Sequence, residues 1–385
     1  ARKGVNKGVH DPLLAKVLLL KSENEQLALI TYDLIAFPSE RVTRVAREEL
    51  GISHVVHVAS HTHSGPSPKR RDKIFDDPYF EEVEQKVLAL LNDLQSGYVP
   101  ARMAVTESSI LLAHNRRKIE ADGTVSMFWR NAEKIPTWPV DPTVGIVRFT
   151  SEAGEPLAIL VHFACHPVVL GPDNLDYSAD FVGFMYRFIE KQLGGATVCF
   201  YLPGASGDIN PFFDKQPVNK NGFGVAQDMG EKLGEAVVQA LKRLPATACV
   251  EPRLRVAERL YNFKRRFAVD DDISDTAMPV QVTHILLGDE IALVAIPGEV
   301  FVRHQIDLRM RSPLRHTFLV GYAHSGNGQF AGYVPTIEAA IEGGYGADYA
   351  TRIEVGAGEH MIDQAVIWIQ YQLGLLKGVP DMRGY

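Results

Sequence analysis

The sequence contains little cysteine. Three of its 385 residues are cysteines, and no two of them form a Cys-x-x-Cys pair. An odd number of cysteines without that spacing argues against a disulfide framework and against a thiolate zinc site. Cys165 and Cys199 lie in strand-like apolar runs, so we expect both to be small buried side chains.

Long apolar runs and a strong excess of charge are also missing. No stretch reaches the ~18 consecutive apolar residues that indicate a membrane-spanning helix. The formal net charge of −7 argues against nucleic acid or an anionic membrane as the main partner. The chain begins at Ala1 without an apolar leader, which is expected when a leader has been removed or the start trimmed.

Strand-like and helix-like patterns alternate along the whole chain, and no internal repeat or low-complexity linker interrupts them. Strands are predicted at Leu14–Leu20, Gln26–Tyr32, His54–Ala59, Met103–Ala113, Thr143–Phe149, Pro156–Ala164, Ala196–Leu202, Arg253–Phe263, Val280–Leu287, Ile291–Ile296 and Thr317–Ala323. Helices are predicted at Ser39–Leu50, Pro78–Leu94, Asp180–Leu193, Gly222–Leu244, Pro297–Arg311 and Met361–Leu375. This alternation predicts an α/β fold, with α+β as the alternative, in which mixed sheets are flanked by helices. Residues 1–385 are expected to form a single large domain.

The most distinctive stretch is Ser60-His61-Thr62-His63-Ser64-Gly65-Pro66. It follows a predicted strand, and Gly-Pro marks a loop at its end. Two histidines at positions i and i+2 at the mouth of a strand point to the same side of the backbone. We therefore expect His61 and His63 to act together at one site. His54 and His57, earlier in the same strand, are expected to be structural or on the surface.

Other polar residues also follow predicted strands, where one scaffold can bring distant positions together. They are Asn115, Arg116, His166, Asp208 and Glu299. Two histidines with one carboxylate are a common ligand set for a catalytic zinc, which keeps one position open for water. Bound zinc lowers the pKa of that water and polarises a carbonyl group.

Each of these residues also has a purely structural interpretation. A histidine such as His166 after an apolar strand is often a hydrogen-bonded core residue. Glu299 would suit the first turn of a helix, where the macrodipole favours a carboxylate. The Gly204–Pro211 loop resembles a turn more than a phosphate loop, because the Lys-Ser/Thr pair that should follow is missing.

Taken together, several segments resemble the catalytic domain of the neutral, non-lysosomal (neutral/alkaline) ceramidases. The resemblance runs from Gly8-Val9-His10-Asp11 to about residue 360. Its segments are Ser60-His61-Thr62-His63-Ser64-Gly65-Pro66, His162-Phe163-Ala164-Cys165-His166-Pro167, Gly207-Asp208-Ile209-Asn210-Pro211, Pro297-Gly298-Glu299 and Gly332-Tyr333-Val334-Pro335-Thr336. The first segment is specific, whereas Pro-Gly-Glu gains its weight from the order in which all five occur.

The resemblance implies a zinc hydrolase that cleaves an N-acyl amide, such as ceramide, by metal-activated water. By position it implies one zinc per chain. The implied zinc ligands are His61, His166, Glu299 and Tyr333. It places His63, Arg116 and Tyr345 in catalytic roles, with His63 facing the substrate. His63 is the first candidate for the acid that protonates the leaving amine, and Tyr345 is the second.

Two departures from the family pattern bear on the substrate. Asn210 stands where the family has a serine that was proposed as nucleophile, and an amide cannot take that role. A mechanism that uses metal-activated water does not need the serine. Asn210 and Asp208 are expected at the substrate, and Asp208 also as a support for a ligand histidine. Because the sequence ends at Tyr385, we expect a short form without the C-terminal immunoglobulin-like domain of longer ceramidases.

Two alternatives to a ceramidase-like amidase remain open at this point. One is a zinc hydrolase of the same fold that acts on another small amide, ester or lactone. The other is a non-catalytic metal-binding member of the fold. The expected partner is a small-molecule or lipid-like substrate. The resemblance favours a secreted or periplasmic location, and the sequence fixes neither the compartment nor the oligomeric state.

Overall fold

Three four-stranded sheets make up the body of the molecule. The computed structural model describes residues 3–23, 25–66, 77–245, 247–266, 277–326 and 328–377. Within them the strand orders of the larger sheets are β19-β4-β3-β2, β12-β10-β9-β5 and β14-β15-β16-β18. Their strands are β2 (Ala15–Ser22), β3 (Glu25–Tyr32), β4 (His54–Ala59), β5 (Ala101–Ser109), β9 (Thr143–Ser151), β10 (Pro156–Phe163), β12 (Val198–Pro203), β14 (Leu254–Lys264), β15 (Ala277–Leu287), β16 (Ile291–Ala295), β18 (His316–Val320) and β19 (Ala323–His324).

Shorter strands pair in twos: β1-β11, β13-β6, β17-β20 and β7-β8. They are β1 (Gly8–Val9), β6 (Ala113–Asn115), β7 (Arg117–Ile119), β8 (Val125–Met127), β11 (Asp176–Tyr177), β13 (Ile209–Pro211), β17 (Glu299–Val300) and β20 (Tyr333–Val334). The strand predicted at Met103–Ala113 is thus two strands, because β5 ends at Ser109 and β6 pairs with β13 instead.

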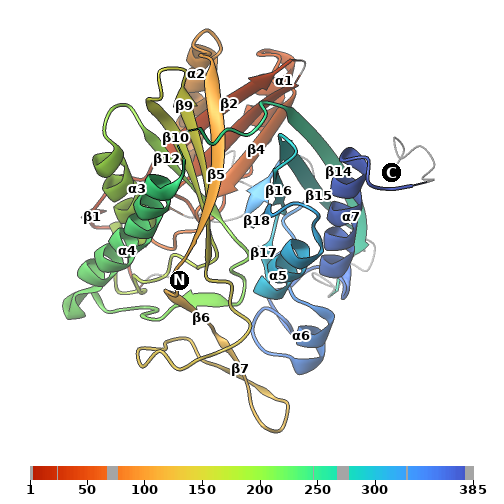
Figure 1. Cartoon of the computed structure of the whole chain (residues 1–385). Coiled ribbons are helices and arrows are strands. Elements are labelled where there is room, and N and C mark those ends of the chain that lie inside the picture. Colours follow the sequence, from red (N-terminus) through yellow and green to blue (C-terminus); the bar gives the residue numbers. More distant parts are fainter. Residues whose placement is uncertain are drawn as a thin grey trace.

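Helices cover the outer faces of the sheets. They are α1 (Glu40–Glu48), α2 (Pro78–Leu94), α3 (Asp180–Leu193), α4 (Gly222–Arg243), α5 (Val302–Arg311), α6 (Ile337–Glu342) and α7 (Ala357–Gln372), with a 3-10 turn at Val218–Lys220. Figure 1 shows α3 and α4 on one side and α5 and α7 on the other, with the sheets between them. None of the helices in the described ranges has the length and apolar character needed to cross a membrane.

The predicted helix at Pro78–Leu94 illustrates how local sequence sets an element. The side chain of Asp77 accepts a hydrogen bond from the backbone N–H of Tyr79, and Pro78 occupies the first turn, where its missing N–H costs nothing. Phe80, Val87 and Leu91 recur at helical spacing and are buried. The observed helix has the predicted bounds.

Each of the three larger sheets contains one pair of parallel strands. These pairs are β3 with β4, β10 with β12, and β16 with β18. Parallel neighbours end at the same edge of a sheet, so the loops that follow them lie side by side. The three sheets also share one apolar core, to which Leu29, Leu160 and Leu293 each contribute from a different sheet. The loops at the three edges therefore face a common region.

Candidate metal centre

The loops after the parallel strands bring the predicted site residues together. His61 follows β4, His166 follows β10 and Glu299 begins β17 just after β16. The His61 backbone N–H donates to the carbonyl of Leu34, 3.0 Å away, which ties this loop to the one that follows β3. His61 has a left-handed backbone (φ 67°), so its side chain turns out of the strand direction. The residues predicted at these strand ends therefore lie close together.

Hydrogen bonds to backbone carbonyls orient the two buried histidines. Nδ1 of His61 lies 2.6 Å from the carbonyl oxygen of Ile35, and Nδ1 of His166 lies 3.2 Å from that of Ile209. A carbonyl oxygen only accepts, so each Nδ1 carries the proton. The opposite nitrogens, Nε2, both approach one carboxylate oxygen of Glu299, at 3.5 Å for His61 and 3.2 Å for His166.

Burial sets the charge of this group. It lowers the pKa of His166 to about 4, so the ring is neutral near pH 7. Burial favours the protonated form of Glu299, but His61 and His166 outweigh it and hold the pKa of this carboxyl well below its usual value. A carboxylate oxygen thus faces the lone pair of a neutral imidazole, an arrangement that a cation between them stabilises.

The donor set fits a zinc ion. Zinc bonds of about 2.0–2.2 Å in tetrahedral geometry place two ligand atoms about 3.4 Å apart. The Nε2–Oε2 separations of 3.5 and 3.2 Å match that spacing. Both histidines are braced through Nδ1, as metal-bound histidines usually are.

His63 belongs to the same cluster but differs in exposure. One nitrogen from each of His61, His63 and His166 lies within 4.8 Å of the others, and only His63 is exposed. Its ring centre is 5.0 Å from that of His61 and 6.2 Å from that of His166. This geometry lets His63 reach either a metal or a substrate.

A second group, Arg116 with Tyr333 and Tyr345, borders the histidines. Nη2 of the buried Arg116 donates to the phenol oxygen of Tyr333 at 3.2 Å and to the carbonyl of Gly207 at 2.6 Å. The Tyr345 ring lies 5.1 Å from that of Tyr333, and the guanidinium stands 5.2 Å from the Tyr345 ring. Tyr333 pairs with Glu299 in the parallel ladder β17-β20, so these predicted residues share one site.

Asn210 contacts this group through Arg116. Its Oδ1 accepts a hydrogen bond from Nη1 of Arg116 at 3.1 Å, and the side chain is buried. Asn210 therefore fixes the arginine from the side away from Tyr333. The expected contact with substrate stays a prediction.

Asp208 has a different place from the one expected. One carboxylate oxygen accepts from the backbone N–H of Val302 at 2.8 Å, and the other from Asn115 at 2.7 Å. Since both oxygens hold the start of α5 and the strand β6, Asp208 does not orient a ligand histidine. It lines a separate cavity of about 340 Å³ together with Trp138 and Arg303, so it supports the scaffold of the site.

Glu299 does not lie in the first turn of a helix, which was its purely structural interpretation. The helix predicted from Pro297 begins only at Val302, and Glu299 lies in the short strand β17. The reason is that the Glu299 backbone N–H donates to the carbonyl of Gly332 at 2.8 Å, which draws this segment into pairing with β20. The carboxylate therefore faces the histidines and is not in the first turn of a helix.

Sequence reasoning missed Tyr322. Its ring stacks on that of His61 with centres 4.2 Å apart, and its hydroxyl lies 3.3 Å from Nε2 of His166 and 2.9 Å from the hydroxyl of Ser206. The signal was available, because Tyr322 follows strand β18 just as His61 follows β4. A second missed feature is the Ile35 carbonyl, which no side-chain pattern reveals.

The site opens onto a cavity of about 230 Å³. Its lining residues are Ile35, Ala36, Phe37, Pro38, His57, His61, His63, Glu299, Tyr322, His324, Phe330, Tyr333 and Tyr345.

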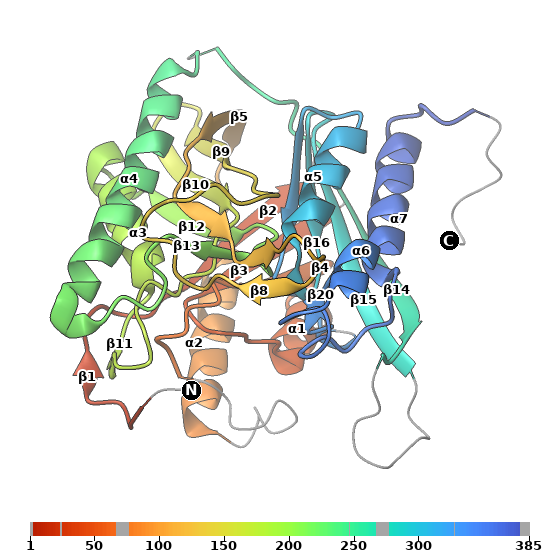
Figure 2. The same ribbon diagram turned by 90° about the horizontal axis from the view of Figure 1, so that it is seen from below.

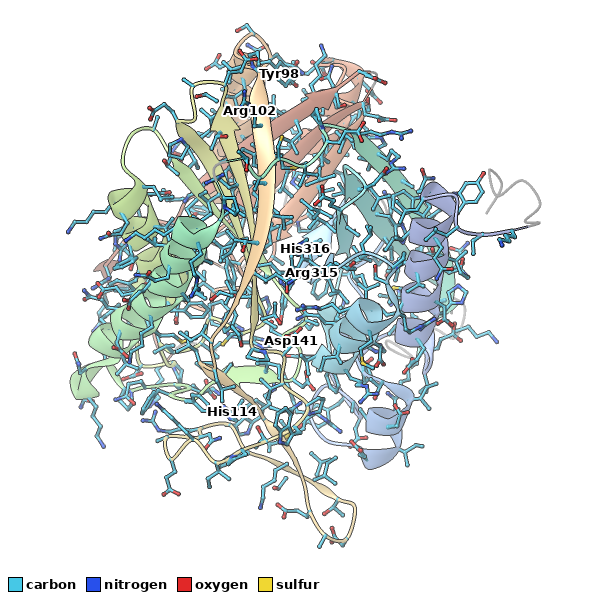
Figure 3. The ribbon with its side chains drawn as sticks, in the orientation of Figure 1. Tyr98, Arg102, His114, Asp141, Arg315 and His316 are labelled. Atoms are coloured by element: carbon cyan, nitrogen blue, oxygen red, sulfur yellow. The ribbon has the colours of Figure 1, made fainter. Side chains whose placement is uncertain are left out.

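In Figure 3, His114 in β6, two residues before Arg116, lies toward one end of the molecule, and Tyr98 and Arg102 lie at the other. In Figure 2 the same end, with β8, β13, β20 and α6, faces the viewer.

Comparison with known proteins bears on the fold of the chain. No protein-family model matches the sequence. Two solved structures resemble the whole chain or nearly so. A ceramidase complexed with C2 has a TM-score of 0.76 and 15% identity, covering 100% of this chain and 74% of that one. Neutral ceramidase from Pseudomonas aeruginosa has a TM-score of 0.72 and 16% identity, covering 94% of this chain and 70% of that one. The chain therefore has the α/β fold of the neutral ceramidases.

Proposed function

We propose that this protein is a zinc-dependent hydrolase that cleaves an N-acyl amide. The observation that carries the proposal is the convergence of two imidazole nitrogens on one oxygen of Glu299, at 3.5 and 3.2 Å, in the wall of a cavity. His61, His166 and Glu299 would hold the ion, with Tyr333 as the fourth ligand. Zinc would supply a Lewis acid that activates water and polarises the scissile carbonyl.

The surrounding residues have separate tasks in this proposal. His63 is exposed beside the buried pair, so it can give a proton to the leaving amine and then take up another proton from water. Tyr345 is the second candidate for that proton. Arg116 holds the phenol oxygen of Tyr333 through Nη2 and adds positive charge where the carbonyl oxygen becomes negative.

Asn210 supports a reaction without a side-chain nucleophile at this position. Its amide oxygen accepts a hydrogen bond from Arg116, and an amide nitrogen is not a nucleophile of the serine type. The same observation makes an ester or lactone the second candidate substrate. Arg116 has an amide neighbour here where the family has a serine hydroxyl, so the substrate next to it can differ as well. For those substrates the leaving group is an alcohol, which needs less help from His63 than an amine does.

The test is metal analysis combined with a substrate panel. We expect one zinc per chain by elemental analysis, loss of amide hydrolysis with a chelator, and recovery when zinc is returned. The panel contains ceramide, simple N-acyl amides, esters and lactones. Unchanged activity in zinc-free protein would disprove metal dependence. Zinc-loaded protein that turns over nothing in the panel would point to a non-catalytic member of the fold.

A further inference from the structure

The cavity beside the metal centre extends away from the catalytic residues along β4. His57 and His61 both line it, and they are separated by four positions of chain. His57 lies within β4 and His61 lies just after its end, so the cavity follows the last part of this strand. Besides the site residues, its lining comes from the loop after β3, from His57 in β4, from His324 in β19 and from Phe330.

Phe37 is a fixed part of the inner wall. Its ring packs edge-on against Tyr32, with centres 4.7 Å apart, and stacks on Phe80 at 5.6 Å. Only 3% of its surface is exposed. Ile35, Ala36 and Pro38 flank it along the cavity, so this side presents a continuous apolar surface that does not rearrange easily.

His57 and His324 also line the cavity. They are directly opposite partners in the antiparallel pairing of β4 with β19, so their side chains lie on the same face of the sheet. Nδ1 of His57 contacts the hydroxyl of Tyr32 at 3.0 Å and Nε2 contacts that of Thr43 at 2.9 Å. Burial lowers the pKa of His57 to about 3 and that of His324 to about 4. Both rings are neutral near pH 7, so they offer no charge to a bound anion or cation.

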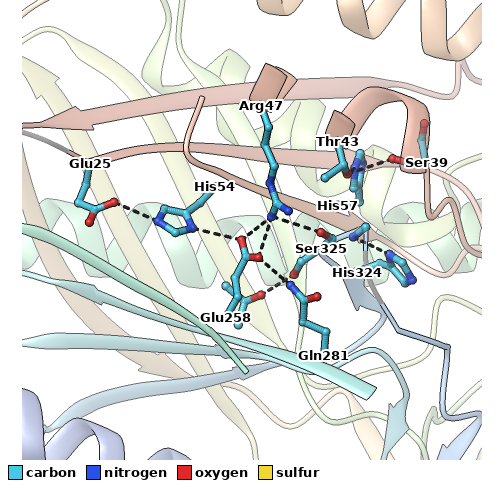
Figure 4. Close-up of polar contacts among 12 residues, drawn as sticks. Glu25, Ser39, Thr43, Arg47, His54, His57, Glu258, Gln281, His324 and Ser325 are labelled. Carbon is cyan, nitrogen blue, oxygen red and sulfur yellow. Dashed lines mark hydrogen bonds and ion pairs between the residues drawn. The ribbon is translucent and has the colours of Figure 1, made fainter. Parts of the chain in front are cut away.

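A polar network behind His324 holds this wall in place (Figure 4). Arg47 binds both carboxylate oxygens of Glu258, at 2.6 and 2.7 Å, and also reaches the carbonyl of Ser325 at 3.5 Å. The hydroxyl of Ser325 is hydrogen-bonded to Thr283 in β15. The segment that carries His324 is thus tied to α1 and to the neighbouring sheet.

We propose that this cavity receives the acyl group of the substrate, and that it selects a compact, uncharged acyl group of at most about nine carbons. The inference rests on the proposed hydrolysis and adds the substrate class. A cavity of 150 Å³ holds one benzene molecule, so about 230 Å³ corresponds to about nine carbon atoms. Long fatty acyl groups exceed this space, and the neutral rings of His57 and His324 offer no charge to a carboxylated or aminated acyl group.

The first experiment is an acyl-length series with one common leaving amine. N-acyl-4-nitroanilides from acetyl to palmitoyl, together with benzoyl and phenylacetyl, are compared by kcat/KM with the zinc-loaded protein. We expect the maximum between butyryl and octanoyl, activity on phenylacetyl, and a fall of at least tenfold from octanoyl to palmitoyl. A maximum at palmitoyl would overturn the inference.

Two variants change the cavity in opposite directions. Ala36→Leu fills it and should move the optimum to butyryl or shorter, while Phe37→Ala enlarges it and should reduce the octanoyl-to-palmitoyl ratio to below threefold. Ala153→Leu, the same substitution at an exposed turn between β9 and β10, should leave the optimum in place. All variants should keep zinc, and an optimum that neither cavity variant moves would refute this site.

A binding measurement separates this inference from the proposed reaction. Acyl hydroxamates of the same lengths ligate zinc without being hydrolysed, and calorimetry gives their affinities. Tightest binding at intermediate length together with no amide turnover would support the cavity and refute the reaction. Affinity that keeps rising to palmitoyl, with or without turnover, would refute the cavity assignment.

Discussion

His61 and His63 lie two positions apart in the chain yet differ in burial and in partners. His61 is buried and braced by the carbonyl of Ile35, whereas His63 is exposed. We predict that His61→Ala loses both zinc and activity, because a ligand and its alignment disappear. His63→Ala should keep zinc and lose 100-fold or more in kcat, the size of a general-acid contribution.

Elemental analysis and steady-state kinetics on the two variants measure this difference. His54→Ala, in the same strand and outside the cavity lining, serves as the control for loss of an imidazole. Stoichiometric zinc in His61→Ala, or zinc loss in His63→Ala, would contradict the division of roles.

Asn210 gives a second test at this scale. Its side chain contacts the site through the hydrogen bond from Arg116 to Oδ1. Asn210→Ala should retain zinc and lower kcat/KM by about 10- to 100-fold, because a hydrogen bond to a charged group contributes about 1.5–3 kcal/mol. Asn210→Asp, which keeps an acceptor, should recover part of the loss. Complete zinc loss in Asn210→Ala would show that this loop holds the metal directly.

At the scale of elements, the loop at Gly207 and the strand β17 are packed against each other. A Cβ on Gly207 would lie 2.3 Å from the carbonyl oxygen of Glu299, a distance that no side chain tolerates. Gly207→Ala should therefore displace β17, lower the free energy of unfolding by about 1–3 kcal/mol and weaken zinc binding.

Denaturant unfolding and zinc titration of Gly207→Ala check this prediction. Gly97→Ala is the matched control, since its Cβ would meet only the Leu94 carbonyl at an ordinary 3.6 Å. Wild-type zinc affinity in Gly207→Ala would mean that β17 moves without carrying Glu299 away from the histidines.

Elements were predictable from the sequence where local pattern and tertiary packing agree. The helix at Asp180–Leu193 and the strand at His54–Ala59 have the predicted bounds. The helix expected from Pro297 starts late because β20, a segment over thirty positions away, pairs with Glu299. Pairing between segments so far apart in the chain cannot be predicted from the residue pattern around Pro297.

The candidate site was partly predictable for the same reason. Polar residues directly after apolar runs, such as His61 and His166, can be seen in the sequence. The role of Asp208 could not be, because its partners Val302 and Asn115 come from distant segments. The polar neighbourhood of a side chain depends on which loops meet, and that depends on how the three sheets pack.

At the scale of the whole molecule, buried neutral histidines make stability depend on pH. Burial lowers the pKa of His284 to about 4, and that of His162 to about 4. In the unfolded chain these rings titrate near 6.5, so between pH 6.5 and 4 the unfolded state binds more protons than the folded state. The free energy of unfolding therefore falls as pH falls through this range.

His284→Phe tests this in a residue far from the metal centre, packed on Trp368 at 5.3 Å. We expect the variant to lose about 3 kcal/mol less stability than the wild type between pH 7 and pH 4, from the difference of the two pKa values. Denaturant melts at the two pH values measure it. Equal losses in both proteins would show that the pKa of His284 is the same in the folded and the unfolded state, which would contradict this prediction.

The three sheets each supply part of the metal centre, with His61, His166 and Glu299 separated by up to 238 positions of chain. During synthesis the first histidine emerges long before the carboxylate, and a fragment that lacks any one sheet cannot complete the set. Under the proposed function, metal capture would be a late event that follows assembly of the sheets. A bound ion would then connect the three sheets, and metal content would report completed folding as well as catalytic competence.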